Sequence, residues 1–190
     1  MNEVEKLKKE KNEKIDSTIT NYNKIKFLVD YFKETDEFKN KNIKLELLYR
    51  GTRDGDSTIN LHNKCDGLKN IIVLMESEQR NIFGMYSKIG WETREKPEYL
   101  NDDEAILFSF KKNKIYKIIK GKGNVCWVDN TYGFCLYDSI RFYNNFLKVK
   151  GKFSIIHKNI SSNFENCEIE DFNSGLQNFK FKEIEIFQIK

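Results

Sequence analysis

Residues 45–77 read LELLYRGTRDGDSTINLHNKCDGLKNIIVLMES, and the spacing of apolar residues in this stretch decides the fold class. Two apolar runs, at 45–49 and 71–75, are short and are bounded by polar turn residues. Short runs of this kind are typical of strands, because a helix of a globular domain needs a longer pattern with apolar residues every three or four positions. We therefore predict two strands with a polar connection between them.

The connection itself predicts a helix. Asp54-Gly55 is typical of a turn, and Asp56 or Ser57 can cap a helix by accepting a hydrogen bond from a free backbone N–H. That helix should run to about Lys64 and end in the turn Asp66-Gly67.

The same strand pattern continues to the end of the chain. Further runs are NIFGMY (81–86), AILFSF (105–110), KIYKIIK (114–120), NVCWV (124–128), YGFCLY (132–137), NNFLKV (144–149) and EIEIFQI (183–189). IIVLM and AILFSF are apolar at adjacent positions, which predicts central strands covered on both faces, whereas the others alternate and suit a sandwich with a wet outer face. KGKGN (120–124) and DNTYG (129–133) should be tight turns that join consecutive strands into a meander. We predict an α+β fold that is mainly β: a two-sheet antiparallel β-sandwich flanked by short helices.

The N-terminal part has a different pattern. In residues 1–14 Lys and Glu are spaced to pair along one helical face, and from Ile15 to Phe32 apolar residues recur at helical spacing. The heptad pattern that begins with Val4 and Leu7 continues with lysines, so a long coiled coil is poorly supported. We predict a charged helical extension over 1–40 and a β-sandwich domain over 41–190. The second half of the extension should dock on the domain, and the first half should project into solvent, where a partner can pair with it.

Composition indicates a single core in a reducing compartment. The chain has 190 residues, 39% of them hydrophobic, and no apolar run approaches the roughly 20 residues that span a bilayer. Its start lacks the apolar centre of a secretory signal, so we expect the protein in the cytoplasm or the nucleus. The four cysteines are scattered without a disulfide spacing and should be free thiols.

Charge is unevenly distributed along the chain, although the net charge is only +4. Between Lys111 and Lys152 there are ten basic residues against two acidic ones, whereas Glu165 to Glu185 holds six acidic residues against two lysines. These segments are either two solvated faces or a bipolar docking surface.

Two chemical interpretations of the helix compete with a structural one. Its predicted inner face carries Thr58, Leu61, His62 and Cys65. A zinc site could combine His62 and Cys65 with Cys126 and Cys135, but the paired Cys-x-x-Cys spacing of structural zinc sites is missing. A histidine beside a cysteine can also lower the pKa of the thiol and produce a nucleophile. His157 has no carboxylate nearby in sequence, and the short glycine pair around Lys122 reads as a hairpin turn and not as a phosphate loop. Packing of this face against the sheet explains the residues without chemistry, and we predict no catalytic, cofactor or metal site.

The order of the motifs resembles the TLDc domain family. LLYRGTRDGDSTINLHNKCDG, IIVLMES, NIFGMYSKIGW and DDEAILFSF follow the family's strand, D-G-x-S turn, H-x-x-C-D helix, strand, F-G-G-Y strand with a nearby Trp, and A-F-L-F-S strand. YGFCLYDSIRFYNNF and EIEIFQI resemble its late hairpin and closing strand, so that the resemblance covers about 43–190. The matching positions are Asp54, Gly55, Ser57, His62, Cys65, Asp66, Phe83, Gly84, Tyr86 and Trp91. The second glycine of F-G-G-Y is Met85 here.

The resemblance implies a function as well as a fold. The family is associated with resistance to oxidative stress, several members bind the vacuolar proton-pumping ATPase, and no catalytic residues are established for it. We therefore expect a non-enzymatic protein-interaction module of the oxidative-stress-response type, with vacuolar ATPase subunits as partners. One alternative is a thiol-dependent peroxide scavenger that uses Cys65 or an exposed Cys126. Another is a basic module that binds nucleic acid or anionic lipid through Lys111–Lys152. The sequence does not decide the oligomeric state.

Overall fold

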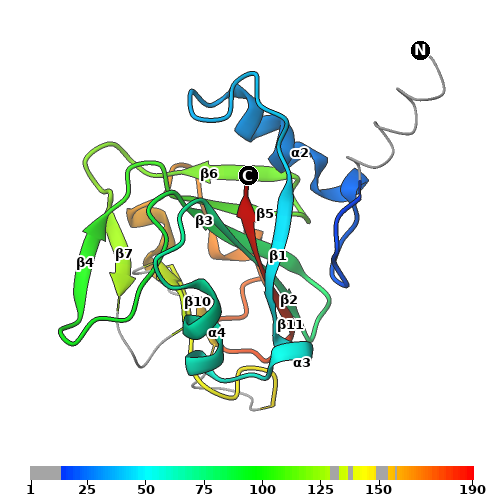
Figure 1. Ribbon diagram of the computed structural model, residues 1–190. Helices are drawn as coiled ribbons and strands as arrows, with labels where there is room; N and C mark the ends of the chain where they lie inside the picture. Colours follow the sequence, from blue (N-terminus) through cyan, green and yellow to red (C-terminus); the bar gives the residue numbers. More distant parts are fainter. Residues whose placement is uncertain (1–13, 129–132, 137–138, 149–153, 157) are drawn as a thin grey trace.

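The computed structural model describes residues 14–128, 133–136, 139–148, 154–156 and 158–190. Two antiparallel sheets form a sandwich (Figure 1). The first sheet has the order β1-β11-β2-β3-β5-β6, and the second has the order β10-β9-β8-β7-β4. The predicted architecture, a mainly β sandwich with few helices, is therefore confirmed.

The elements have the following bounds. The first sheet consists of β1 (Leu45–Arg50), β2 (Ile71–Ser77), β3 (Ile82–Ser87), β5 (Ile106–Ser109), β6 (Lys114–Lys117) and β11 (Phe181–Ile189). The second sheet consists of β4 (Glu98–Asn101), β7 (Asn124–Val128), β8 (Cys135–Leu136), β9 (Ile140–Phe142) and β10 (Ser154–Ile156). The helices are α2 (Tyr22–Glu34), α3 (Gly51–Asp54) and α4 (Thr58–Cys65), with 3-10 turns η1 (Lys158–Ser162) and η2 (Ile169–Asp171).

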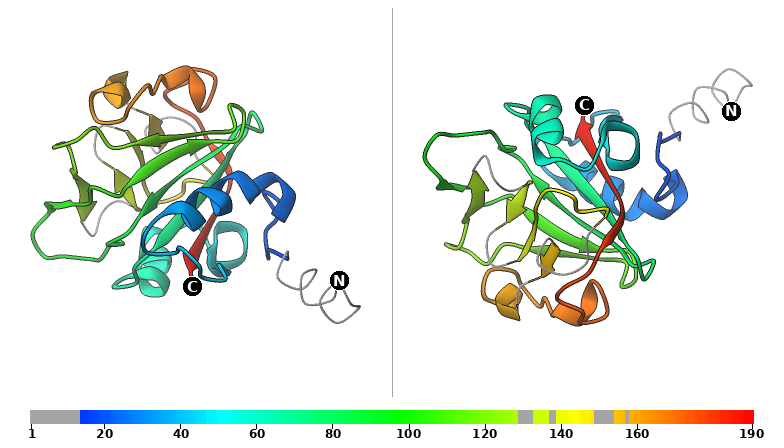
Figure 2. Two further views of the ribbon diagram at one scale, coloured as in Figure 1. Left: turned by 90° about the horizontal axis from the view of Figure 1, so that it is seen from above. Right: turned by 90° about the horizontal axis from the view of Figure 1, so that it is seen from below.

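The first sheet is covered on both faces, as IIVLM and AILFSF predicted. Every residue of β2 and β5 is buried. On β2, Ile71, Val73 and Met75 belong to the core between the sheets, whereas Ile72 and Leu74 belong to a second core beneath α2. Because successive strand residues point to opposite faces, a fully apolar run needs a cover on each side. Seen from above, α2 crosses the strands of this sheet (Figure 2).

Helix α2 docks through its apolar stripe. Ile25, Leu28, Val29 and Phe32 are buried in the second core, so the predicted docking of the second half of the extension is confirmed. The helix begins only at Tyr22, after the cap residue Asn21, whose side chain accepts a hydrogen bond from the Lys24 N–H at 3.1 Å.

The predicted helical pattern from Ile15 onward is therefore wrong before Tyr22. The Ser17 hydroxyl oxygen accepts hydrogen bonds from the Ile19 and Thr20 N–H groups, at 3.1 and 3.0 Å. Serine side chains offer the backbone such alternatives to a helix. The helix predicted for 1–14, and its projection into solvent, fall on residues of which only Lys14 is described.

One predicted strand and one predicted connection differ in the structure. Residues 144–148 of the predicted strand NNFLKV form a turn, in which Asn145 has a φ of 62° and its carbonyl accepts from the Lys148 N–H at 3.0 Å. The segment KGKGN joins β6 to β7, which lie in different sheets, so it passes between sheets and does not close a hairpin. Most of DNTYG lies outside the described residues, and its neighbours β7 and β8 pair antiparallel.

The fold has no membrane-crossing helix within the described ranges, since none there is long and apolar enough.

Candidate functional site

The Asp-Gly turn after β1 is built by its own charges. The Asp54 carboxylate accepts from the Arg50 N–H at 2.9 Å and from two nitrogens of the Arg53 guanidinium at 3.0 and 2.7 Å. The hydrogen bonds from Arg53 lower the pKa of Asp54 to about 2. Gly55 follows with a φ of 90°, a conformation that favours glycine, and its carbonyl accepts from the Tyr49 hydroxyl. Asp54 and Gly55 therefore hold the end of α3 and the start of the next turn.

The predicted cap and helix are confirmed. Ser57 precedes α4, and its side-chain oxygen accepts from the Asn60 N–H at 3.3 Å. The first helical N–H, that of Thr58, donates to the Asn144 side chain at 2.6 Å, which ties the helix to the turn after β9. The helix ends at Cys65, within one residue of the prediction, and Asp66 is its C-cap.

His62 and Trp91 link the helix to both sheets. The His62 Nδ1 lies 2.6 Å from Asp66 Oδ1, and the other Asp66 oxygen accepts from the Thr93 N–H at 2.6 Å. Phe134 packs edge-on against His62 and is stacked on Trp91, with ring centroids 4.6 Å apart in the second pair. The Trp91 Nε1 donates to the Cys135 carbonyl at 3.0 Å. These motif residues thus meet in one place, where they connect α4, the loop after β3 and β8.

The thiols are all buried. Burial raises the pKa of Cys65 to about 12 and also raises the pKa of Cys126 and of Cys167. The Cys126 thiol donates to the Gly90 carbonyl at 3.3 Å, so the expectation that Cys126 is exposed was wrong. A reactive thiol needs access to solvent and a lowered pKa, and neither Cys65 nor Cys126 has them. Among the described residues, no three His, Cys, Asp or Glu side chains gather into a group that could hold a metal ion.

The remaining motif residues pack the sheet. Phe83 lies in the main core against Phe172 and Phe179. A Cβ atom on Gly84 would lie 2.2 Å from the Val73 carbonyl oxygen, so this position requires glycine. Tyr86 donates from its hydroxyl to the Asn70 side chain at 3.0 Å.

Met85, at the position of the family's second glycine, is fully buried in the main core. The side chain thus points away from the face on which Gly84 meets the α2 side of the sheet. The sequence motif therefore specifies packing rather than a reactive centre.

Sequence reasoning missed a buried carboxylate, Glu185 on β11. It is completely inaccessible, and its oxygens accept from the Thr18 N–H at 2.8 Å, the Thr18 hydroxyl at 3.0 Å and the Arg50 Nε at 2.7 Å. The Ser17 hydroxyl donates to it as well. Alternation in EIEIFQI suggested a solvated glutamate, and only Arg50 and the hydroxyls at 17–18, far apart in sequence, could have signalled a buried one.

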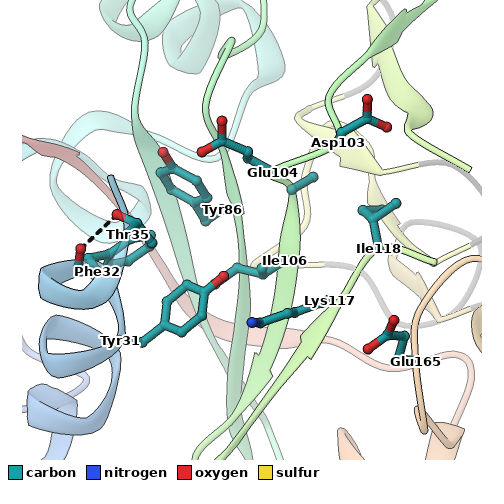
Figure 3. Close-up of a pocket in the computed structure, with 11 residues that line it drawn as sticks. Tyr31, Phe32, Thr35, Tyr86, Asp103, Glu104, Ile106, Lys117, Ile118 and Glu165 are labelled. Atoms are coloured by element: carbon teal, nitrogen blue, oxygen red, sulfur yellow. Dashed lines mark hydrogen bonds between the residues drawn. The ribbon is translucent and has the colours of Figure 1, made fainter. Parts of the chain in front are cut away.

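A hollow of about 280 Å³ lies between α2 and the strands β5 and β6 (Figure 3). Tyr31 reaches across it from α2, and the Lys117 Nζ lies 5.5 Å from the centroid of that ring. Burial, with a contribution from the charge of Glu104, raises the pKa of Tyr31. Glu104 is paired with Lys88. The charged rim of the hollow is therefore in part already paired.

The start of the basic segment contacts the acidic segment. Lys112 Nζ lies 3.5 Å from the Asp171 carboxylate, and Lys114 Nζ donates to the Asn166 carbonyl at 2.9 Å. Glu183 and Glu185 at the end of the acidic segment are buried. These contacts do not support the bipolar docking surface, which was one of the two alternatives that the charge pattern left open.

Comparison with known proteins gives a match, and it is to a protein family. A search of curated proteins gave no match to the sequence. The family model of the TLDc domain matches residues 13–190, a range that includes α2 as well as the two sheets. The chain therefore belongs to the TLDc domain family.

Proposed function

We propose that this TLDc domain is a non-enzymatic protein-interaction module of the oxidative-stress response, and that its partner is the vacuolar proton-pumping ATPase. Family membership supports the general role. One observation about the ten motif positions carries the proposal. Each of these residues is buried in a core, caps a helix or forms a turn. Because the motif residues serve packing, we infer that the protein contacts other molecules through its surface and not through a reactive centre. We also place the protein in the cytoplasm or nucleus, where buried thiols stay reduced.

The peroxide scavenger is the weaker candidate because both proposed nucleophiles are inaccessible. A thiolate must form and must meet peroxide, whereas burial raises the pKa of Cys65 and of Cys126.

Binding to the purified vacuolar ATPase tests the finer proposal. The immobilised protein should bind the detached catalytic sector of that enzyme saturably, as measured by biolayer interferometry. The matched control is the catalytic sector of an F-type ATPase, which is of similar size and should not bind. Equal binding of the two sectors would refute the proposed partner.

Peroxide consumption tests the non-enzymatic role. The wild-type protein, supplied with dithiothreitol, should consume peroxide no faster than a Cys65→Ser/Cys126→Ser protein. A catalytic rate in the wild type that the double variant loses would overturn the proposal.

A further inference from the structure

A groove lies where two hairpin turns of the first sheet meet the start of α2. The turns join β2 to β3 and β5 to β6, and the strand order places both at the same end of the sheet (Figure 2). We call this the basic groove and define it by Lys24, Arg80, Asn81, Ile82, Phe110 and Lys111. Its volume of about 590 Å³ is twice that of the hollow beside Tyr31. The groove has room for several residues of a bound chain.

The groove is positively charged. Lys24, Arg80 and Lys111 are exposed, and no carboxylate among the described residues lines it. Arg80 lies 3.2 Å from Glu76, but Lys182 shares that carboxylate at 2.8 Å. Arg80, Lys182 and Glu76 together therefore keep a net positive charge. Lys111 donates to the Ser174 hydroxyl, a neutral partner. Within the described part of the chain, neither Lys24 nor Lys111 forms an ion pair with a carboxylate.

Hydrogen bonds and a ring contact fix the backbone and the aromatic part of the groove. The Arg80 N–H donates to the Ser77 carbonyl at 2.9 Å, and the Ser77 N–H donates to the Asn81 carbonyl at 3.0 Å. Phe110 is held edge-on by Phe27 of α2, with centroids 5.3 Å apart. A preformed surface loses little conformational entropy when it binds.

The apolar residues of the groove narrow the class of ligand. Ile82 and Phe110 are half-buried, and they lie among the basic side chains. A free phosphate would leave this apolar surface unused, and a planar bilayer would reach mainly the rim of a concave groove. A peptide uses both parts, because acidic side chains can pair with the rim while one apolar side chain covers Ile82 and Phe110.

We propose that the basic groove binds an extended acidic segment of a protein partner, with one apolar residue seated on Ile82 and Phe110. This proposal rests on the proposed function and adds the chemistry of the segment that the module recognises.

A labelled model peptide tests the proposal directly. The probe is a fluorescein-labelled twelve-residue peptide of Asp and Glu with one central Leu, and binding to the full chain is followed by fluorescence anisotropy. Affinity should fall as salt rises from 50 to 300 mM, because exposed charges are screened. A Lys24→Glu/Lys111→Glu protein should bind at least about tenfold more weakly, since like charges then face each other. Replacing the central Leu with Ser should weaken binding about fivefold, which reports the apolar contact.

The matched control is Lys39→Glu/Lys120→Glu. These lysines are exposed, lie outside the groove and give the same change in net charge, so binding should match the wild type. A Lys24→Gln/Lys111→Gln protein provides the same test without charge reversal, should the first variant not fold. Equal loss in the control, or no loss in either groove variant, would overturn the proposal.

Two further arms separate other ligands and the underlying function. The first arm tests vesicles with 30% phosphatidylserine and a single-stranded oligonucleotide. If either binds in a way that depends on Lys24 and Lys111, and the peptide does not bind, the peptide proposal is overturned in favour of a lipid or nucleic-acid surface. If the ATPase sector binds and groove variants bind it equally well, the groove proposal fails while the proposed function stands. Failure of the sector to bind, with the peptide still bound at the groove, would refute only the named partner.

Discussion

Removal of the buried carboxylate of Glu185 should destabilise the protein strongly. The carboxylate accepts four hydrogen bonds, from the Ser17 hydroxyl, the Thr18 N–H and hydroxyl, and the Arg50 Nε. In a Glu185→Ala protein, these donors lose their acceptor and Arg50, with 13% of its side chain exposed, loses its buried partner. Breaking a buried pair by removing one member costs about 3–5 kcal/mol. Arg50 keeps a contact with Asp16, so we expect about 3 kcal/mol.

Urea unfolding followed by circular dichroism measures this loss. For a chain of this size a loss of about 3 kcal/mol corresponds to a fall in melting temperature of about 6–12 °C. Glu185→Gln keeps the shape and one acceptor oxygen, so it should lose about half as much. The segment 14–20 should also become more sensitive to protease, because Glu185 is what fixes Ser17 and Thr18 to the sheet.

A control and a double-mutant cycle make the reasoning refutable. Glu46→Ala removes an exposed glutamate of β1 and should change stability by no more than about 0.5 kcal/mol. Glu185→Ala combined with Arg50→Met should show a coupling of about 1–3 kcal/mol. A Glu185→Ala protein within about 1 kcal/mol of the wild type, with no coupling to Arg50, would show that the buried network contributes little.

Four further outcomes are expected. Gly84→Ala should lower the urea stability by about 1–3 kcal/mol or more, because the new Cβ would lie 2.2 Å from a backbone oxygen; wild-type stability would show that the sheet yields easily. Ser57→Ala should lower the free energy of unfolding by about 1 kcal/mol in the same assay through loss of the helix cap. A neutral result would show that the Ser57 cap does not stabilise α4. Asp54 has a pKa of about 2 when folded, below its ordinary value, so its stabilising effect is complete above about pH 4 and is lost as the pH falls toward 2. Asp54→Asn should therefore flatten that part of the curve of stability against pH. An unchanged slope would contradict the lowered pKa of Asp54. Cys65 and Cys126 should react with a thiol-specific dye only in urea, and rapid labelling of the native protein, located by mass spectrometry, would contradict their burial.

The local part of the fold could be predicted because its signals are local. The cap at Ser57, the turn at Asp66 and the apolar run of β2 each depend on residues within one or two turns of chain. The family motif also identified residues that pack together, such as His62 and Trp91, which both contact Phe134.

What the sequence did not reveal depends on distant partners. NNFLKV has the alternation of a strand, but Asn145 in the left-handed conformation turns the chain there. Glu185 alternates like a solvated residue and is buried because Thr18 and Arg50 reach it from other parts of the chain. The basic groove likewise joins two hairpin turns and a helix start, and no stretch of sequence contains it.

The place of β11 in the first sheet has a consequence for how the protein is made. The last strand in sequence lies between β1 and β2, and it pairs with both (Figure 1). Until residues 181–189 have left the ribosome, β1 and β2 each carry an unpaired edge, and such edges can pair with other chains. The sheet can close only after synthesis has passed this strand, so chaperones have these edges to protect until residues 181–189 are available. A chain stopped before residue 181 should accumulate as aggregate, because the edges of β1 and β2 that β11 would cover remain open to neighbouring copies.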